Sequence, residues 1–297
     1  MIIDPRFFNR SIRRKSFRME TIQLVINLLM PGDFLATLDL KDAYLHIPIH
    51  PGSRRFLRIA VQVQGILRHY QFVALPFGIS SAPHTFTKVV VSVVAALRLQ
   101  GLCIVPYLDY WILKAFSQAI LSQHIQTTVS FLYQLGWIIN LNKSNLQPAT
   151  SVRFLGFMID SVAMTIHLTP ERKLRVQDTA QSLLVPKRET LPYLMRMVGL
   201  MSATVETVPW ALWHLRPLQS EVLAIWNPSR EELNSMHSLS PQVQSSLRWW
   251  IHLQDNQSLI QPVWIILTTD ASLMGWGVHL LDKTGQGTWS PQEKMLS

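Results

Sequence analysis

Short apolar runs separated by turn residues dominate the first 165 residues, a pattern that predicts β-strands joined into hairpins. A strand is expected over 34–39, followed by a turn and a second strand over 46–50, in which Pro48 indicates an edge or irregular position. Two hairpins are predicted as well, one from the runs 56–63 and 67–74 and the other from the runs 103–109 and 110–113.

Two helices are predicted between these strands. One should begin after Ser80 and Ser81, whose hydroxyls are suitable N-terminal caps, and continue to Arg98. The other spans 117–135, and Gly136 is the kind of residue that ends a helix. Strands and helices in this order predict an α+β fold.

The pattern changes beyond residue 165, where helical stretches separated by prolines replace the hairpins. Eight of the ten tryptophans lie from Trp210 onward, which favours a separate helical region. Strand patterns return at 263–270 and 275–280, close to the end of the chain.

Length and composition exclude several classes of protein. With 297 residues, of which 48% are hydrophobic and 15% charged, the chain is too apolar for a disordered protein and suits one large domain or two modest ones. Cys103 is the single cysteine, which excludes an intrachain disulfide and a thiolate zinc site and favours a reducing, intracellular setting. The apolar run 89–97 is shorter than the roughly 20 residues that a bilayer requires, so no membrane contact is expected, and the N-terminus shows no secretory signal.

The net charge of +9 lies almost entirely in the first third of the chain. Residues 1–100 contain 13 basic and 5 acidic residues, a net charge of +8, with the densest clusters at 13–15 and 54–58. A basic surface of this kind is typical of proteins that contact nucleic-acid phosphates, and a solvated basic face is the alternative.

Two carboxylates stand out because each ends an apolar strand, where a charge is costly to bury. They are Asp39 and Asp109. Adjacent strand ends in one sheet would bring them close together, and close carboxylates need a cation between them, for which Mg²⁺ is the common choice in phosphoryl transfer. The alternative is that each residue caps a turn. Asp270 ends another apolar strand, but its distance along the chain favours a separate site.

Several segments resemble reverse transcriptases in residues, order and spacing. The run 37–49 (TLDLKDAYLHIPI) resembles their first metal-binding motif, 75–83 (LPFGISSAP) their template and nucleotide motif, and 107–110 (YLDY) their Tyr-x-Asp-Asp turn. Further likenesses are to the palm motif that carries a lysine, to the primer-grip hairpin and to the fingers, at 135–143, 154–157, 3–9 and 17–21. The residues FRMET at 17–21 and TDASLMGWG at 269–277 are most similar to DIRS-type, tyrosine-recombinase retrotransposons.

This resemblance implies a right-hand polymerase fold, with N-terminally truncated fingers and a palm built on an antiparallel sheet over 1–165. It implies a helical thumb and connection over 166–258 and the truncated start of a ribonuclease H-like domain over 259–297. The implied reaction is RNA-directed DNA synthesis, in which deoxynucleoside triphosphates extend a primer on an RNA or DNA template with two Mg²⁺ ions as cofactors.

The resemblance also implies which residues hold the metal ions. Asp39 and Asp109 would be the catalytic carboxylates, and Leu40 would lend only its backbone carbonyl. Asp270 would be one of four acidic metal ligands of the ribonuclease H-like segment. Because the other three ligands should follow beyond the truncation, cleavage of an RNA–DNA hybrid is not expected.

Five further residues are implied at the nucleotide. Arg6 would lie along the triphosphate as a multidentate donor, and Tyr44 would stack under the sugar and exclude a 2′-hydroxyl. Phe77 and Gly78 would line the nucleotide and template pocket, and Lys143 could protonate the leaving pyrophosphate. The alternatives are a core aromatic at Tyr44 and a solvated lysine at Lys143.

One departure from the family pattern bears directly on activity. The family has a second carboxylate after Asp109, where this chain has Tyr110. Tyrosine, with a reference pKa of about 10, is neutral at pH 7, so ion binding should weaken and catalysis should be impaired. Asp42 is not expected to substitute, because the family has an acid there beside its usual three. A non-catalytic nucleic-acid-binding remnant and an unfolded product are the alternatives.

Overall fold

A computed structural model describes residues 6–13, 15–185, 188–226, 236–255, 257–259, 267–272, 274–280 and 283–290. Asp4 of the expected fingers motif and residues 263–266 of the expected late strand lie outside these residues. The chain divides into two compact units, residues 1–257 and 258–297, which are described separately.

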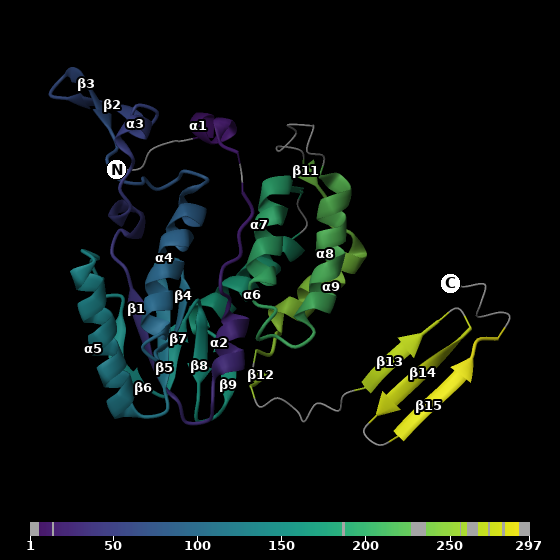
Figure 1. Ribbon diagram of the computed structural model, residues 1–297. Helices are drawn as coiled ribbons and strands as arrows, with labels where there is room; N and C mark the ends of the chain where they lie inside the picture. The colour runs from purple at the N-terminus through teal and green to yellow at the C-terminus, as the bar shows by residue number, and fades with distance from the viewer. Residues whose placement is uncertain are drawn as a thin grey trace. The chain divides into compact units, whose positions relative to one another are not determined.

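The centre of the first unit is a four-stranded antiparallel sheet with the strand order β4-β5-β1-β6 (Figure 1). Its strands are β1 (Phe34–Asp39), β4 (Cys103–Tyr107), β5 (Tyr110–Ala115) and β6 (Asn145–Ala149). The predicted strand 34–39 and the predicted hairpin around Asp109 are therefore confirmed. The antiparallel sheet that the resemblance implies for this part of the chain is therefore present.

Both faces of this sheet are covered, which explains why its strands are continuous apolar runs. On one face, Leu38 and Trp111 pack with the helices α4 (Ala82–Arg98) and α5 (Gln118–Gln134) in the main core. On the other face, Leu35 and Ile112 lie beside α2 (Ile22–Leu28). The predicted helices after Ser81 and over 117–135 are confirmed, although the Ser81 side chain makes no capping hydrogen bond.

The segments before and after β1 contain α1 (Arg6–Ser11), α3 (Pro51–Arg54) and the hairpin of β2 (Arg58–Val63) and β3 (Ile66–Gln71). This hairpin projects from the rest of the unit in Figure 1. The hairpin turns at Gln64 and Gly65, both at positive φ (51° and 82°), as a two-residue primed turn requires. The predicted hairpin is confirmed, with shorter strands than expected.

The strand predicted over 46–50 is wrong. Residues 43–46 form a short 3₁₀ helix, η1 (Ala43–His46), and an isolated bridge joins Pro48 to Ala74. The bridge is flanked by two backbone hydrogen bonds, from the Ile49 amide to the Val73 carbonyl oxygen (2.8 Å) and from the Leu75 amide to the Ile47 carbonyl oxygen (2.9 Å). The pairing does not extend into a strand because η1 ends at His46 and α3 begins at Pro51.

A second antiparallel sheet follows, built from β7 (Ser151–Phe154), β8 (Phe157–Asp160) and β9 (Thr165–Leu168). The hairpin predicted around 154–157 is confirmed, and Leu155 and Gly156 form its turn at positive φ (51° and 81°).

The region beyond residue 169 is helical, as predicted. Its elements are α6 (Pro170–Leu184), β10 (Glu189–Thr190), α7 (Leu191–Ser202), α8 (Ala211–Ile225), β11 (Met236–His237) and α9 (Pro241–Ile251). Prolines stand in the first turn of α6, α7 and α9, where their fixed φ suits a helix start. Asp255, which is buried, accepts from the Leu168 amide (3.0 Å) and from Lys173 (2.7 Å) and thereby joins β9 to α6.

The two residues of β12 (Gln257–Ser258) are the last residue of the first unit and the first residue of the second. The second unit is a three-stranded antiparallel sheet of β13 (Leu267–Ala271), β14 (Gly275–Leu280) and β15 (Lys283–Thr288). Strand patterns predicted near 270 and over 275–280 are confirmed in the described part. Within the described residues, no helix combines the length and the apolar character needed to cross a bilayer.

Candidate active site

The end of β1 and the turn between β4 and β5 are bonded to each other and carry the two predicted aspartates. The Leu40 amide donates to the Asp109 carbonyl oxygen (2.8 Å), and Asp39 is paired with Tyr110 in the ladder. Leu108, beside Asp109, has a φ of 53°, a conformation that non-glycine residues adopt at a cost. The tight turn therefore presents Asp109 next to Asp39, as the sequence predicts.

The ionisation of Asp39 reflects this proximity. Its pKa is raised above the ordinary value, first by burial and then by the negative charge of Asp109. Lys143 and a hydrogen bond with the Asn140 side chain act in the opposite direction and lower this pKa. Two carboxylates that repel each other in a partly buried place form an arrangement that a cation would stabilise.

Asn140 and Ser144 support the backbone of Asp39, and sequence reasoning gave neither of them a role. The Asn140 amide donates to the Asp39 carbonyl oxygen (2.8 Å), and the Asp39 amide donates to the Ser144 hydroxyl (2.9 Å). The same hydroxyl donates to the Asn140 carbonyl oxygen (2.8 Å). Asn140 lies within residues 135–143, the segment that resembles the palm motif carrying a lysine. This resemblance is the one sequence feature that could have indicated a role for Asn140.

Tyr44 combines two ring contacts with an electrostatic interaction with Asp109. Its ring packs against Phe77 (centroids 4.9 Å apart) and against the buried ring of Phe86 (5.4 Å). The pKa of Tyr44 is raised by burial and then by the charge of Asp109, so this phenol is close enough to Asp109 to sense its charge. Tyr44 is thus packed against the core and also faces the site.

The Tyr110 phenol is committed elsewhere. Its hydroxyl donates to the carbonyl oxygen of Arg153 in β7 (2.9 Å), and its ring lies against Phe154 with a centroid separation of 5.1 Å.

Asp42 is exposed at the start of η1 in a left-handed conformation, where its carbonyl accepts from the Leu45 amide (2.8 Å). Among the described residues, no three His, Cys, Asp or Glu side chains gather into a metal-binding group.

The loop before α4 is bonded to α1 through Asn9, which sequence reasoning missed. The Asn9 side-chain nitrogen donates to the Gly78 carbonyl oxygen (2.9 Å), and its oxygen accepts from the Ser80 amide (2.8 Å). Gly78 has a φ of 92°, which explains the glycine there. Arg6 begins α1, and its side chain lies outside the described atoms.

Asp270 belongs to the second unit. It is exposed on β13, paired with Gly277, and borders a shallow depression with residues of β14 and β15. Among the described residues that line this depression, Asp270 is the only one with an acidic side chain.

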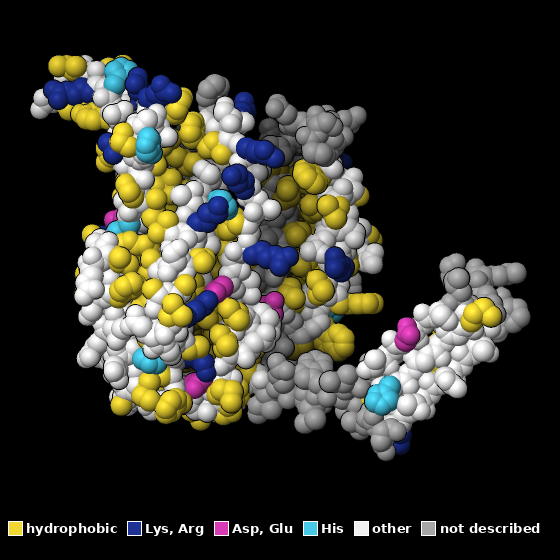
Figure 2. All heavy atoms as spheres, in the orientation of Figure 1, with side chains coloured by type: hydrophobic (Ala, Val, Ile, Leu, Met, Phe, Trp, Pro, Cys, Tyr) yellow, Lys and Arg dark blue, Asp and Glu magenta, His cyan; other side chains and the backbone are white. Residues whose placement is uncertain are grey.

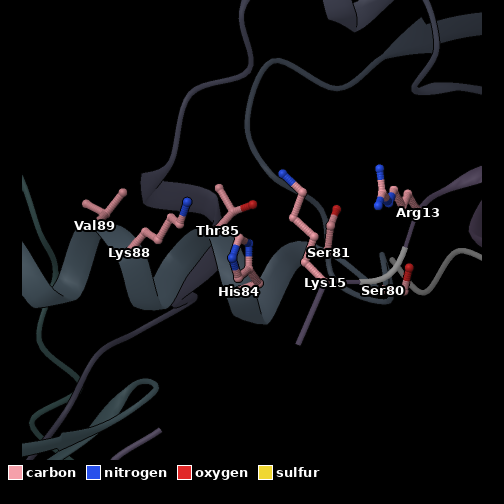
Figure 3. Close-up of a pocket in the computed structure, with 8 residues that line it drawn as sticks. All are labelled: Arg13, Lys15, Ser80, Ser81, His84, Thr85, Lys88 and Val89. Carbon is pink, nitrogen blue, oxygen red and sulfur yellow. The ribbon is translucent and has the colours of Figure 1, made fainter. Parts of the chain in front are cut away.

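A basic pocket of about 660 Å³ lies on the outward face of α4 (Figure 3). Its lining residues are polar or basic apart from one valine, and none is acidic: Arg13, Lys15, Ser80, Ser81, His84, Thr85, Lys88 and Val89. The opposite face of α4 carries the buried Phe86 and Val90. Figure 2 shows Lys and Arg side chains gathered on the face of the molecule that it presents.

The model of the family "Reverse transcriptase (RNA-dependent DNA polymerase)" matches residues 4–159, which include both aspartates, Tyr44, Phe77, Gly78 and Lys143. The chain belongs to the reverse transcriptase family. Residues 6–159 of the described structure correspondingly hold the four-stranded sheet, the β2–β3 hairpin and the β7–β8 hairpin.

This reverse transcriptase domain resembles several viral proteins. Protein P of duck hepatitis B virus (strain China) is 31% identical over 160 residues, which are 53% of this chain and 19% of the viral protein. The Gag-Pol polyprotein of Rous sarcoma virus is 32% identical over 142 residues, 46% of this chain and 9% of the polyprotein. The chain thus spans a fifth or less of the length of these two relatives.

Solved structures show the fold. A foamy viral protease-reverse transcriptase in complex with double-stranded DNA matches with a TM-score of 0.63 and 20% identity over 99% of this chain and 50% of that one. The same viral protein in complex with an RNA/DNA hybrid matches with a TM-score of 0.61. The predicted right-hand polymerase fold is confirmed.

Proposed function

We propose that this chain is a reverse transcriptase domain of a DIRS-type retrotransposon whose polymerase activity is impaired. The reaction is the extension of a primer on an RNA or DNA template by deoxynucleoside triphosphates. The observation that carries the proposal is the bonding of the β1 end to the β4–β5 turn, which sets Asp39 beside Asp109 in a chain of this family. The DIRS-type assignment rests on the residues at 17–21 and 269–277.

The residues present fit divalent metal ions, although with one ligand fewer than the family pattern has. Asp39 and Asp109 offer the carboxylates, and their mutual repulsion, expressed in the raised pKa of Asp39, favours a cation between them. Two Mg²⁺ ions bound there would activate the primer 3′-hydroxyl and neutralise the triphosphate. The Tyr110 phenol is neutral and bonded to Arg153, so it adds no anionic ligand.

The remaining residues are assigned to binding and orientation. Tyr44, held by Phe77 and Phe86, supports the sugar and excludes a 2′-hydroxyl. Gly78 places the loop that lines the nucleotide, and Arg6 binds the triphosphate. Lys143, whose charge lowers the pKa of Asp39, keeps that carboxylate ionised and can give a proton to pyrophosphate.

The domain boundaries are proposed as fingers and palm over 1–165, thumb and connection over 166–258, and a ribonuclease H-like segment over 259–297. We expect no hybrid cleavage from this segment, because Asp270 is the one acidic side chain among the described residues that line its depression and two-metal hydrolysis needs several carboxylates. Cleavage of an RNA–DNA hybrid that disappears in Asp270→Asn would contradict this.

Primer extension tests the proposal. On poly(A) with an oligo(dT) primer and Mg²⁺, Tyr110→Asp should extend at least about tenfold faster than the natural chain, because it restores an anionic ligand worth about 1.4 kcal/mol or more of barrier. Asp39→Asn in the same background should abolish the gain. Because the metal-ligand explanation predicts that Tyr110→Asp extends at lower Mg²⁺ concentration, an equal dependence of the extension rate on Mg²⁺ concentration in the natural chain and Tyr110→Asp would refute the impairment by Tyr110.

A second candidate function is nucleic-acid binding without catalysis. The basic pocket on α4 and the tyrosine at position 110 favour it. Salt-dependent binding of a primer–template by both the natural chain and Tyr110→Asp, with no extension by either, would select this function, because phosphate contacts need no carboxylates.

A further inference from the structure

We propose that Tyr110 is a positioning residue that fastens the turn carrying Asp109 to the β7–β8 hairpin, while Arg172 fastens the same hairpin to the helical region. The hairpin is then held at both ends, and its place relative to Asp39 and Asp109 is fixed. The consequence drawn for the primer end rests on the proposed function, whereas the contacts themselves do not.

The first attachment is made by the side chain of Tyr110. Its backbone is paired with Asp39 on one side and with Tyr107 on the other, so it is part of the ladder that holds both aspartates. Its hydroxyl donates to the Arg153 carbonyl oxygen (2.9 Å), and its ring packs on Phe154, which is 1% exposed. One residue thus bonds the catalytic turn to β7.

An aspartate at position 110 could not make this bond. An ionised carboxylate only accepts hydrogen bonds, and its partner here would be a carbonyl oxygen, which also only accepts. Its side chain also has no ring to place against Phe154. Tyrosine at this position therefore exchanges an anionic ligand for an attachment between two elements, and Tyr110→Asp reverses both effects at once.

The second attachment lies at the turn of the hairpin. Arg172, in the first turns of α6, donates to the Leu155 carbonyl oxygen (2.6 Å) and to the Ala203 carbonyl oxygen at the end of α7 (2.9 Å). Its guanidinium lies over the Phe157 ring at 4.7 Å from the centroid. A planar group with several donors can make these contacts together, and a lysine could not.

The turn is shaped to admit Arg172. Gly156 has a φ of 81°, and a Cβ atom there would lie 2.5 Å from the Arg172 guanidinium nitrogen. Contacts therefore run without interruption from the turn of Asp109 through Tyr110, along the hairpin and into α6 and α7. The sequence of this hairpin resembles the primer grip, and on the proposed function the two attachments would set the primer end against the aspartates.

Amide hydrogen exchange on the full chain without nucleic acid tests the attachment. Tyr110→Phe keeps the ring and removes the hydroxyl, so exchange at residues 151–155 should become about fivefold faster, the factor of a typical hydrogen bond. Tyr133→Phe, which alters an exposed tyrosine of α5, is the matched control and should leave this exchange unchanged. Unchanged exchange in Tyr110→Phe would overturn the attachment made by Tyr110.

The attachment made by Arg172 has its own test. Arg172→Lys should accelerate exchange at residues 155–158, and unchanged exchange there would overturn this second attachment.

A spectroscopic readout tests the positioning role. With 2-aminopurine as the terminal base of a primer bound to a template, Tyr110→Phe should change the fluorescence of the base, and Tyr133→Phe should not. Faster exchange in Tyr110→Phe with unaltered 2-aminopurine fluorescence would overturn the role in placing the primer. Both readouts are independent of catalysis, so a failure of Tyr110→Asp to extend primers leaves this test intact.

Discussion

The amide nitrogen of Leu40 donates to the carbonyl oxygen of Asp109 at 2.8 Å, although the two residues are far apart in the sequence. This bond continues the β1–β5 ladder beyond Asp39 and joins the two strand ends that carry the carboxylates. The ionisation of Asp39 therefore depends on the charge of Asp109, which raises the pKa of the Asp39 carboxyl.

The pKa of Asp39 should respond to its two charged neighbours in opposite directions. Asp109→Asn removes the negative charge that raises this pKa, so the pKa should fall, and Lys143→Met removes the positive charge that lowers it, so the pKa should rise. Because cations bind the ionised carboxylate, the acid limit of cation binding should move to higher pH in Lys143→Met. Carboxyl ¹³C titration by NMR measures the pKa, and Lys41→Met, an exposed lysine, is the control.

Tyr44 should determine the choice of sugar. In the Tyr110→Asp background, Tyr44→Ala opens the space under the sugar, so the preference for deoxynucleotides over ribonucleotides should fall roughly 10- to 100-fold. Tyr44→Phe keeps the ring against Phe77 and Phe86 and should keep the preference. Single-nucleotide incorporation with dTTP and UTP measures it, and an unchanged ratio in Tyr44→Ala would assign the ring to the core alone.

The basic pocket should bind phosphates. Lys88→Ala combined with Arg13→Ala should weaken binding of a single-stranded oligonucleotide and reduce the slope of log K against log salt by about 1 for each phosphate that is no longer neutralised. Arg18→Ala removes an exposed charge from the same segment outside the pocket lining and should change the slope less. Fluorescence anisotropy between about 50 and 200 mM salt, conditions over which phosphate binding weakens strongly, gives the slope. Equal slopes for the natural chain and the double variant would remove the pocket from the interface.

A buried ion pair should matter for stability far more than an exposed one. Asp33 is 3% exposed and accepts from the Lys114 ammonium (2.5 Å) and the Met30 amide (2.8 Å). Asp33→Ala leaves the lysine charge without its partner and should lower the free energy of unfolding by about 3 kcal/mol. Arg153→Gln, which removes the exposed ion pair between Arg153 and Glu171, should change the free energy of unfolding little. Urea denaturation compares the two variants.

The aspartates were predictable because each interrupts the apolar pattern at the end of a strand. A charge after the run 34–38 or after 103–108 has two main explanations, a turn cap or a site, and the pattern alone did not decide between them. The supporting contacts of Asn140 and Ser144 were not predictable. They join residues about 100 positions apart, and pairing of this kind depends on how β6 packs beside β1 rather than on local preference.

Two features could not be predicted from the sequence. The error over 46–50 has a local cause, and the hydrogen-bond partner of the Tyr110 hydroxyl depends on tertiary packing. The alternation of residues 46–50 resembles a strand, but η1 ends at His46 and α3 begins at Pro51, so only a single bridge forms between them. The resemblance implies that Tyr110 stands where the family has a carboxylate. It cannot show that the hydroxyl reaches Arg153, because that depends on the packing of two hairpins.

Asn9 gives the N-terminal helix its orientation. Its amide group uses one donor and one acceptor on the loop at Gly78 and Ser80, and Arg6 stands three residues earlier on the same helix. Of the side chains of this size, aspartate keeps the acceptor alone and leucine keeps neither. A single atom change at residue 9, from nitrogen to oxygen, would thus remove the donor to the Gly78 carbonyl oxygen and leave the helix that begins at Arg6 with one of these two hydrogen bonds to the loop before α4.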